Sequence, residues 1–152
     1  MNRFLKWIIG LLVLVAIGVF VYSVLNDGLL KKPLSPKKIV SFKVDDIELK
    51  VFYNRPSKRN REIFGALVPY NQVWRTGANE ATTFETNKPL KVGSDSLPAG
   101  KYTLWTIPND STWHVQKIDT TVEQFTIGFD NSTDNLSLTM AWDNTKVVVP
   151  LK

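Results

Sequence analysis

A continuous apolar stretch from Trp7 to Leu25 holds no charged side chain and sets the architecture of the N-terminal part of the sequence. As a helix, these residues would span about 28 Å, close to the ~30 Å hydrocarbon core of a bilayer. Trp7 and Tyr22 lie near the two ends of the stretch, where interfacial aromatic side chains are common. The stretch therefore predicts a transmembrane helix.

Two other interpretations of this stretch are a cleaved signal peptide and a buried core helix. A signal peptide usually has a shorter apolar region followed by a small-x-small cleavage site, and no clear A-x-A site follows here. We favour an uncleaved anchor. The predicted organisation is a cytoplasmic stub (1–6), a transmembrane helix (7–25), a Lys- and Pro-containing linker (26–38) and an exported domain (39–152).

The orientation of the span depends on the basic residues beside it. The lysines that follow the span slightly outnumber the positive groups before it, which by charge alone would favour a cytoplasmic domain. A short N-terminal stub followed by one apolar segment is, however, the usual layout of a signal anchor. We therefore predict a single-pass inner-membrane protein whose domain lies in the periplasm or at the cell exterior.

The net charge of +5 is located entirely in the N-terminal part. Before Ile39 the sequence has six basic residues and one acidic residue, and from Ile39 onward the basic and acidic residues cancel. A domain without excess positive charge has no field that attracts phosphate backbones. The sequence therefore argues against nucleic acid as a partner.

The apolar residues after Ile39 alternate with a period of two, which is typical of strands. Strands are predicted at Ile39–Val44, Ile47–Tyr53, Thr82–Glu85, Lys101–Ile107, Trp113–Gln116, Glu123–Phe129, Leu136–Trp142 and Lys146–Leu151. Asp45-Asp46 is the predicted hairpin tip, and Ser57–Gly65 is predicted to form one short helical turn. Short strands at close spacing favour an all-β, antiparallel β-sandwich of jelly-roll type.

The inventory of reactive groups is small. Cysteine is absent, which excludes disulfides and thiolate metal sites, and His114 is the single histidine. His114 lies in a strand-like segment, where a structural histidine is favoured over a catalytic base. Phosphate-binding and metalloprotease motifs are also absent. The sequence therefore predicts no cofactor, no metal site and no assigned catalytic residue.

The loop Val73–Thr83 gathers Trp74, Arg75, Asn79 and Glu80 around a Thr-Gly-Ala turn. Arginine offers a planar fork of donors for anions, asparagine both donates and accepts, and tryptophan offers a stacking face. A second basic group precedes the loop and could converge on it; its members are Arg55, Lys58, Arg59 and Arg61. An alternative is structural: Arg75 pairs with Glu80 while Trp74 fills the core.

Several longer segments make the sequence resemble DUF2911, a bacterial domain of unknown function. They are YNRPS (53–57), REIFGALVPY (61–70), VWRTGANEATTF (73–84), LPAGKYTLWTIP (97–108) and AWDNTKVVVPL (141–151), together with Ser35-Pro36. The resemblance implies a compact β domain in exported, lipid- or helix-anchored proteins of Gram-negative bacteria. The motif positions are Arg55, Pro56, Arg61, Gly65, Pro69, Trp74, Arg75, Gly77, Asn79, Glu80 and Thr82.

The chain departs from the family pattern in two ways. Asn60 and Asn71 stand where the pattern has glycine, and asparagine is the non-glycine residue that best tolerates a left-handed conformation, so both turns are expected to persist. The segment Gln116–Thr121 is also shorter than the pattern. Loss of strands there would expose a sheet edge, and such edges invite pairing with a partner.

Three functions therefore remain open. The favoured one is a module that binds a small anionic or polyol ligand; its predicted ligand-binding residues are Arg55, Arg61, Trp74, Arg75, Asn79, Glu80 and Thr82. The second is a hydrolase-like enzyme with Glu80 as general acid or base. The third is a structural or assembly protein that pairs through an exposed edge strand. The sequence does not indicate an oligomeric state.

Overall fold

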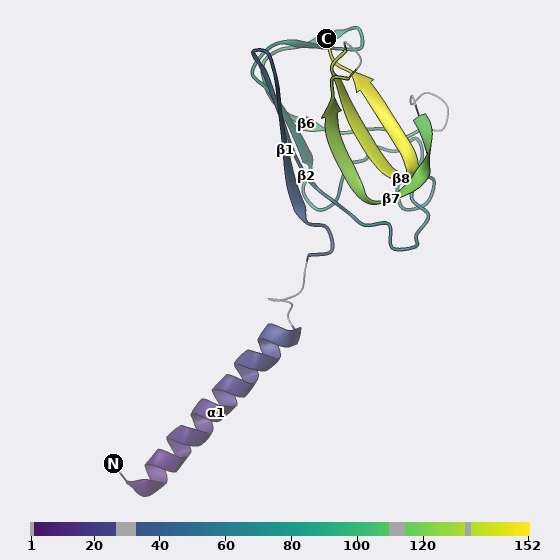
Figure 1. Ribbon diagram of the computed structural model, residues 1–152. Coiled ribbons are helices and arrows are strands. Elements are labelled where there is room, and N and C mark those ends of the chain that lie inside the picture. Colours follow the sequence, from purple (N-terminus) through teal and green to yellow (C-terminus); the bar gives the residue numbers. More distant parts are fainter. Residues whose placement is uncertain (1, 27–32, 110–114, 133–134) are drawn as a thin grey trace. The chain divides into compact units, whose positions relative to one another are not determined.

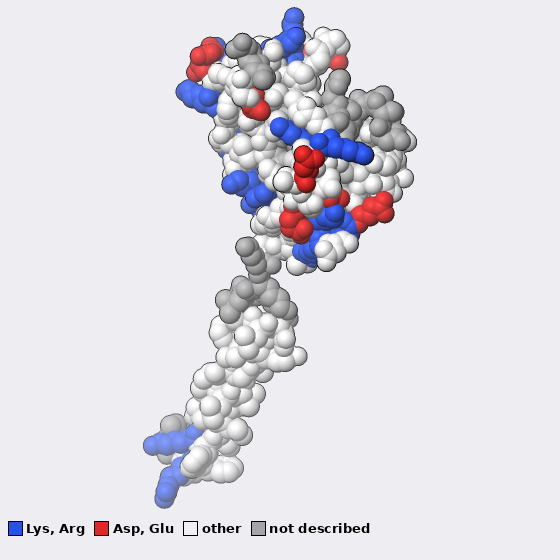
Figure 2. All heavy atoms as spheres, turned by 45° about the vertical axis from the view of Figure 1, so that its right-hand side comes forward, with Lys and Arg blue, Asp and Glu red and all other residues white. Residues whose placement is uncertain are grey.

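The computed structural model describes residues 2–26, 33–109, 115–132 and 135–152, and the chain divides into two compact units, Met1–Pro33 and Leu34–Lys152 (Figure 1). The first unit contains α1 (Arg3–Asn26), none of whose residues is buried. Its apolar length suffices to cross a bilayer, as does that of many N-terminal secretion signals. Figure 2 shows charged side chains on α1 only at its N-terminal end. The helix is thus a secretion signal or a membrane anchor.

The second unit is built from antiparallel strands. They are β1 (Lys37–Val44), β2 (Ile47–Asn54), β3 (Thr82–Thr86), β4 (Leu90–Val92), β5 (Asp95–Leu97), β6 (Gly100–Leu104), β7 (Val115–Asp130) and β8 (Ser137–Pro150). They form a four-stranded sheet in the order β1-β2-β3-β6, a β4-β5 pair and a β7-β8 pair. The predicted antiparallel β organisation after an N-terminal apolar helix is confirmed.

Two hairpins provide the long strands. The β1–β2 hairpin turns at Asp45-Asp46, as predicted, with Val44 opposite Ile47 and Asp45 at a φ of 50°. The four C-terminal segments predicted as separate strands merge into two, β7 and β8. The register between β7 and β8 shifts twice from Lys117 to Thr126.

The apolar faces of the four-stranded sheet and of the β7–β8 pair contribute to one core. Leu49, Val51 and Tyr53 alternate as buried residues on β2. Phe125 and Ile127 do so on β7, and Leu138, Met140 and Trp142 do so on β8. Rings from different sheets touch: the Tyr53 and Phe125 ring centroids are 5.8 Å apart, and those of Phe42 and Phe129 are 5.5 Å apart. The period-two faces predicted for the last strands are confirmed.

The helical turn predicted for Ser57–Gly65 is wrong. The segment forms turns instead, with Arg59 and Asn60 at φ values of 50° and 56°, a conformation that ends any right-handed helix. Asn71 has a φ of 59°. Asn60 and Asn71 thus both adopt the left-handed conformation that the sequence predicted for them.

Candidate functional site

The loop from Trp74 to Glu80 is held by hydrogen bonds to Thr106, which follows β6, and to Thr82 of β3. The amide of Trp74 donates to the carbonyl of Thr106 at 2.7 Å, and the amide of Thr106 donates back at 2.9 Å. Within the loop, Trp74 Nε1 donates to the Gly77 carbonyl at 3.1 Å. The Thr82 hydroxyl donates to the Thr76 carbonyl at 2.7 Å. The loop is therefore a defined structure rather than an open connection.

The backbone of this loop is strained. Thr76 has a φ of 54°, although its β-branched side chain strongly disfavours that region, and it is fully buried. Asn79 has a φ of 57°. A Cβ on Gly77 would lie 3.1 Å from both the Asn54 carbonyl oxygen and the Thr82 hydroxyl. Strain of this kind persists where the surrounding structure enforces it and is concentrated at functional sites.

The loop borders an open cavity of about 430 Å³. From the loop come Trp74, Arg75, Gly77, Ala78 and Asn79, and from the segment after β2 come Pro56, Ser57, Arg59 and Arg61. Leu34, Ser35, Leu67, Val68 and Trp142 complete the lining. We call this cavity the arginine pocket. The two basic groups noted in the sequence converge here through Arg59, Arg61 and Arg75.

Each of the three guanidinium groups is held by neutral backbone carbonyls. Arg59 donates to the Leu34 carbonyl at 3.0 Å, and Arg75 donates to the Asn79 carbonyl at 2.7 Å. Arg61 donates to the carbonyls of Lys58 at 3.0 Å and Ser57 at 2.6 Å. Within residues 2–26, 33–109, 115–132 and 135–152, none of the three forms an ion pair with a carboxylate. Their orientation is thus fixed while their charge is not neutralised.

Two indole rings form the floor of the pocket. Trp74 and Trp142 stack with ring centroids 6.2 Å apart, and Phe125 lies 5.1 Å from Trp74 and 5.7 Å from Trp142. Trp142 is fully buried, and its Nε1 donates to the Glu123 carbonyl at 3.3 Å. The pocket therefore combines an apolar, rigid floor with a cationic rim.

Three residues predicted from the sequence lie outside the pocket. Arg55 is half-buried and donates to the Phe125 carbonyl and the Thr126 hydroxyl of β7, so it joins the two sheets. Thr82 is fully buried behind the loop. Glu80 borders a separate hollow beside Lys50, Phe52 and Lys101.

The Glu80 carboxylate forms an ion pair with Lys37. It accepts from Lys37 Nζ at 2.9 Å, and both side chains are more than half exposed. The alternative in which Arg75 pairs with Glu80 to pin the loop is therefore wrong, because Arg75 is bound to a carbonyl and Glu80 to a lysine. Trp74 does pack on the core aromatics, as that alternative also required.

The pocket contains residues that sequence reasoning did not include among its ligand-binding set. Arg59 belonged to the second basic group but not to the family motif. Leu34, Leu67 and Trp142 come from three distant places in the chain, and only the folded sheets bring them together. The alternating pattern of the C-terminal strands predicted Trp142 on an apolar face, but it gave no sign that this residue borders a pocket.

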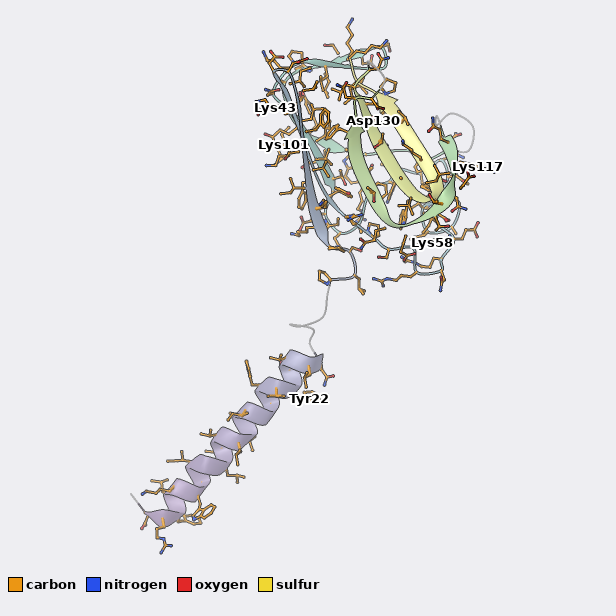
Figure 3. All side chains as sticks on the ribbon, in the orientation of Figure 1. Tyr22, Lys43, Lys58, Lys101, Lys117 and Asp130 are labelled. Carbon is orange, nitrogen blue, oxygen red and sulfur yellow. The ribbon has the colours of Figure 1, made fainter. Side chains whose placement is uncertain are left out.

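Lys58, next to Arg59, is not a free cation. Its ammonium donates to Asp143 at 2.5 Å, and it is labelled in Figure 3 at the end of the domain where β1 begins. Glu123 accepts from the backbone amide of Arg59 at 3.0 Å. Among the residues that the structure describes, no three His, Asp or Glu side chains are grouped to hold a metal ion. His114 lies outside the described residues.

A comparison with protein families identifies a match that covers the strands before β7. Residues 35–117, more than half of the chain, match the family described as protein of unknown function (DUF2911). No curated protein and no solved structure matches the chain. The match contains β1 to β6 and every arginine of the pocket, and it ends near the start of β7. The chain therefore belongs to the DUF2911 family.

Proposed function

We propose that this protein is a membrane-anchored envelope protein whose exported domain binds a small anionic ligand in the arginine pocket. The single observation that supports this most directly is the state of Arg59, Arg61 and Arg75. All three side chains are exposed on the rim of one cavity and are oriented by carbonyls rather than neutralised by carboxylates. A guanidinium retains several N–H donors after one or two such bonds, and these match the oxygens of phosphate or carboxylate.

The proposed arrangement in the cell follows from the apolar helix. We infer that Trp7–Leu25 is retained as a single-pass anchor in the inner membrane, with residues 1–6 in the cytoplasm and the domain in the periplasm or at the cell exterior. The absence of a clear cleavage site after the span supports the anchor over a secretion signal. We also propose that the domain is a β-sandwich, because its two larger sheets share one apolar core.

Within the predicted set, the proposal assigns roles to Arg61, Trp74, Arg75 and Asn79, and it adds Arg59. The arginines bind the anion, and the Trp74 ring supports an apolar part of the ligand. Arg55 and Thr82 maintain the fold around the pocket. Glu80 receives no role in binding, because its carboxylate lies with Lys37; the hydrolase alternative loses its required juxtaposition with Arg75. A polyol ligand is less suited to three cations than an anion.

The experiment is titration of the full chain, in detergent, with inorganic phosphate, a dicarboxylate and a neutral sugar by isothermal calorimetry. We expect stoichiometric heat with the anions and none with the sugar. Arg75→Ala should weaken binding by about tenfold or more, since a hydrogen bond to a charged group contributes about 1.5–3 kcal/mol. Glu80→Gln is the matched loop variant and should bind as the wild type does. Equal affinity of Arg75→Ala and wild type would exclude the proposal.

A further inference from the structure

The arginine pocket has an apolar rim as well as a cationic one. Leu34 and Leu67 border the pocket and are 68% and 43% exposed. The pocket thus presents exposed apolar side chains beside guanidinium groups that are bonded to carbonyls. This combination of apolar and cationic side chains fits a ligand that is anionic at one end and hydrocarbon at the other.

The position of the pocket in the chain adds a second observation. Leu34 and Ser35 are the first residues of the second unit, and Arg59 is bonded to the Leu34 carbonyl. Only seven residues separate Leu34 from Asn26, the last residue of α1. A chain of that length cannot span more than about 28 Å, even fully extended. The proposed anchor would therefore tether Leu34, which lines the pocket, within that chain length of Asn26.

From these observations we propose that the arginine pocket binds the phosphate headgroup of an anionic phospholipid in the membrane that α1 enters. The inference rests on the proposed function and names its ligand class. The guanidinium groups of Arg59, Arg61 and Arg75 take the phosphate oxygens, and Leu34 and Leu67 contact the acyl region near the glycerol. The cost of association is reduced because the short connection holds the pocket near its ligand at high effective concentration.

Charge and exposure favour a headgroup over a free phosphate ester. A small soluble phosphate would use the arginines and leave both leucines in water. Attraction of cations to an anionic leaflet amounts to about 1 kcal/mol for each Arg or Lys near the surface, so three arginines give a measurable preference for anionic lipid. The lysines elsewhere on the domain would give a similar attraction without a pocket, so the test must separate these two sources.

The experiment uses the full chain reconstituted in vesicles. Since the chain has no cysteine, Ala66→Cys beside the pocket or Ser94→Cys at the β4–β5 turn can carry a single polarity-sensitive fluorophore. We expect the label at position 66, but not at position 94, to shift to the blue in phosphatidylcholine vesicles that contain phosphatidylglycerol. Pure phosphatidylcholine should give no shift.

Two matched sets of variants identify the source of the shift. Arg59→Gln/Arg61→Gln/Arg75→Gln should abolish it, whereas Lys91→Gln/Lys101→Gln/Lys117→Gln, which removes the same charge away from the pocket, should retain it. Equal loss in both sets would overturn the inference in favour of general charge attraction. Leu34→Asn/Leu67→Asn should reduce the blue shift in phosphatidylglycerol vesicles, and a shift equal to that of the wild type would contradict a role for the apolar rim.

The outcomes separate the two proposals. Binding of inorganic phosphate in solution without any shift in phosphatidylglycerol vesicles would overturn the lipid inference and leave anion binding in place. Absence of binding to either probe would overturn both. A shift of equal size in pure phosphatidylcholine would also overturn the inference, because it would show that the anionic headgroup is not recognised.

Discussion

Charged side chains have different partners at the two ends of the β domain. At the hairpin end, the Lys43 ammonium lies 2.6 Å from Glu48 and the Lys88 ammonium lies 2.8 Å from Asp46. The hydrogen bond and charge of Glu48 raise the pKa of Lys43, and those of Lys88 lower the pKa of Asp46. At the end that contains the arginine pocket, Lys58 pairs with Asp143, but Arg59, Arg61 and Arg75 bond to carbonyls. Figure 3 shows Lys43 and Lys58 at opposite ends of the domain.

The difference concerns where charge remains available. An ion pair satisfies both partners, so the paired charges at the hairpin end are not available to a ligand. A guanidinium on a carbonyl is oriented but retains its full positive charge, which is the state that an anion-binding site requires before its ligand arrives. On the face of the domain that Figure 2 shows, both signs of charge are present, so the pairing of the three arginines is what distinguishes the pocket.

Removal of the pocket floor should produce the largest effect. Trp142→Ala deletes a fully buried indole that stacks on Trp74, and large-to-small substitutions of this kind cost about 3–5 kcal/mol. We expect a strongly reduced midpoint in thermal unfolding of the full chain in detergent, followed by tryptophan fluorescence. Trp105→Ala is the control, because Trp105 is half exposed. A similar decrease of the unfolding midpoint in both variants would show that the buried indole of the pocket floor contributes no more to stability than an exposed one.

The sequence predicted the strands better than the connections. Alternation on β2, β7 and β8 reports burial on one sheet face, so Leu49, Phe125 and Trp142 were assigned to apolar faces without coordinates. Alternation does not report pairing partners. The two C-terminal pairs of predicted strands therefore merged into β7 and β8. The short strands β4 and β5 were missed because three-residue strands carry too little pattern.

The pocket was predicted in part, for a related reason. Residue type identified Arg61, Trp74, Arg75 and Asn79 as polar or aromatic groups on loops, which is where binding groups concentrate. The direction in which a side chain points depends on the left-handed residues beside it, and on contacts with distant strands. These decide that Glu80 meets Lys37 and that Arg55 meets β7. Only folding joins Arg59 to the carbonyl of Leu34.

Glycine-to-alanine substitutions at the two ends should reduce stability less than Trp142→Ala does, and by different amounts. A Cβ at Gly77 would press on the Asn54 carbonyl and the Thr82 hydroxyl at 3.1 Å, whereas a Cβ at Gly93 meets nothing within 4 Å. We expect Gly77→Ala to cost about 1–3 kcal/mol from overpacking. Gly93→Ala should cost about 1 kcal/mol, because a φ of 62° is unfavourable for alanine. Urea unfolding would measure both; a larger cost at Gly93 would contradict the view that the pocket loop is the more constrained region.

The smallest effect should come from relieving left-handed residues at each end. Asn60→Gly and Asp45→Gly each remove a Cβ from a residue with a φ near 50°, which should raise stability by less than about 1 kcal/mol. The two variants should nevertheless differ in phosphate binding. Asn60 lies between two pocket arginines, so added backbone freedom there should weaken calorimetric affinity, whereas Asp45→Gly should leave affinity unchanged. Equal affinity of both variants and the wild type would mean that the Arg59–Arg61 turn contributes no preorganisation to the site, and the contrast between the two ends would then rest on charge alone.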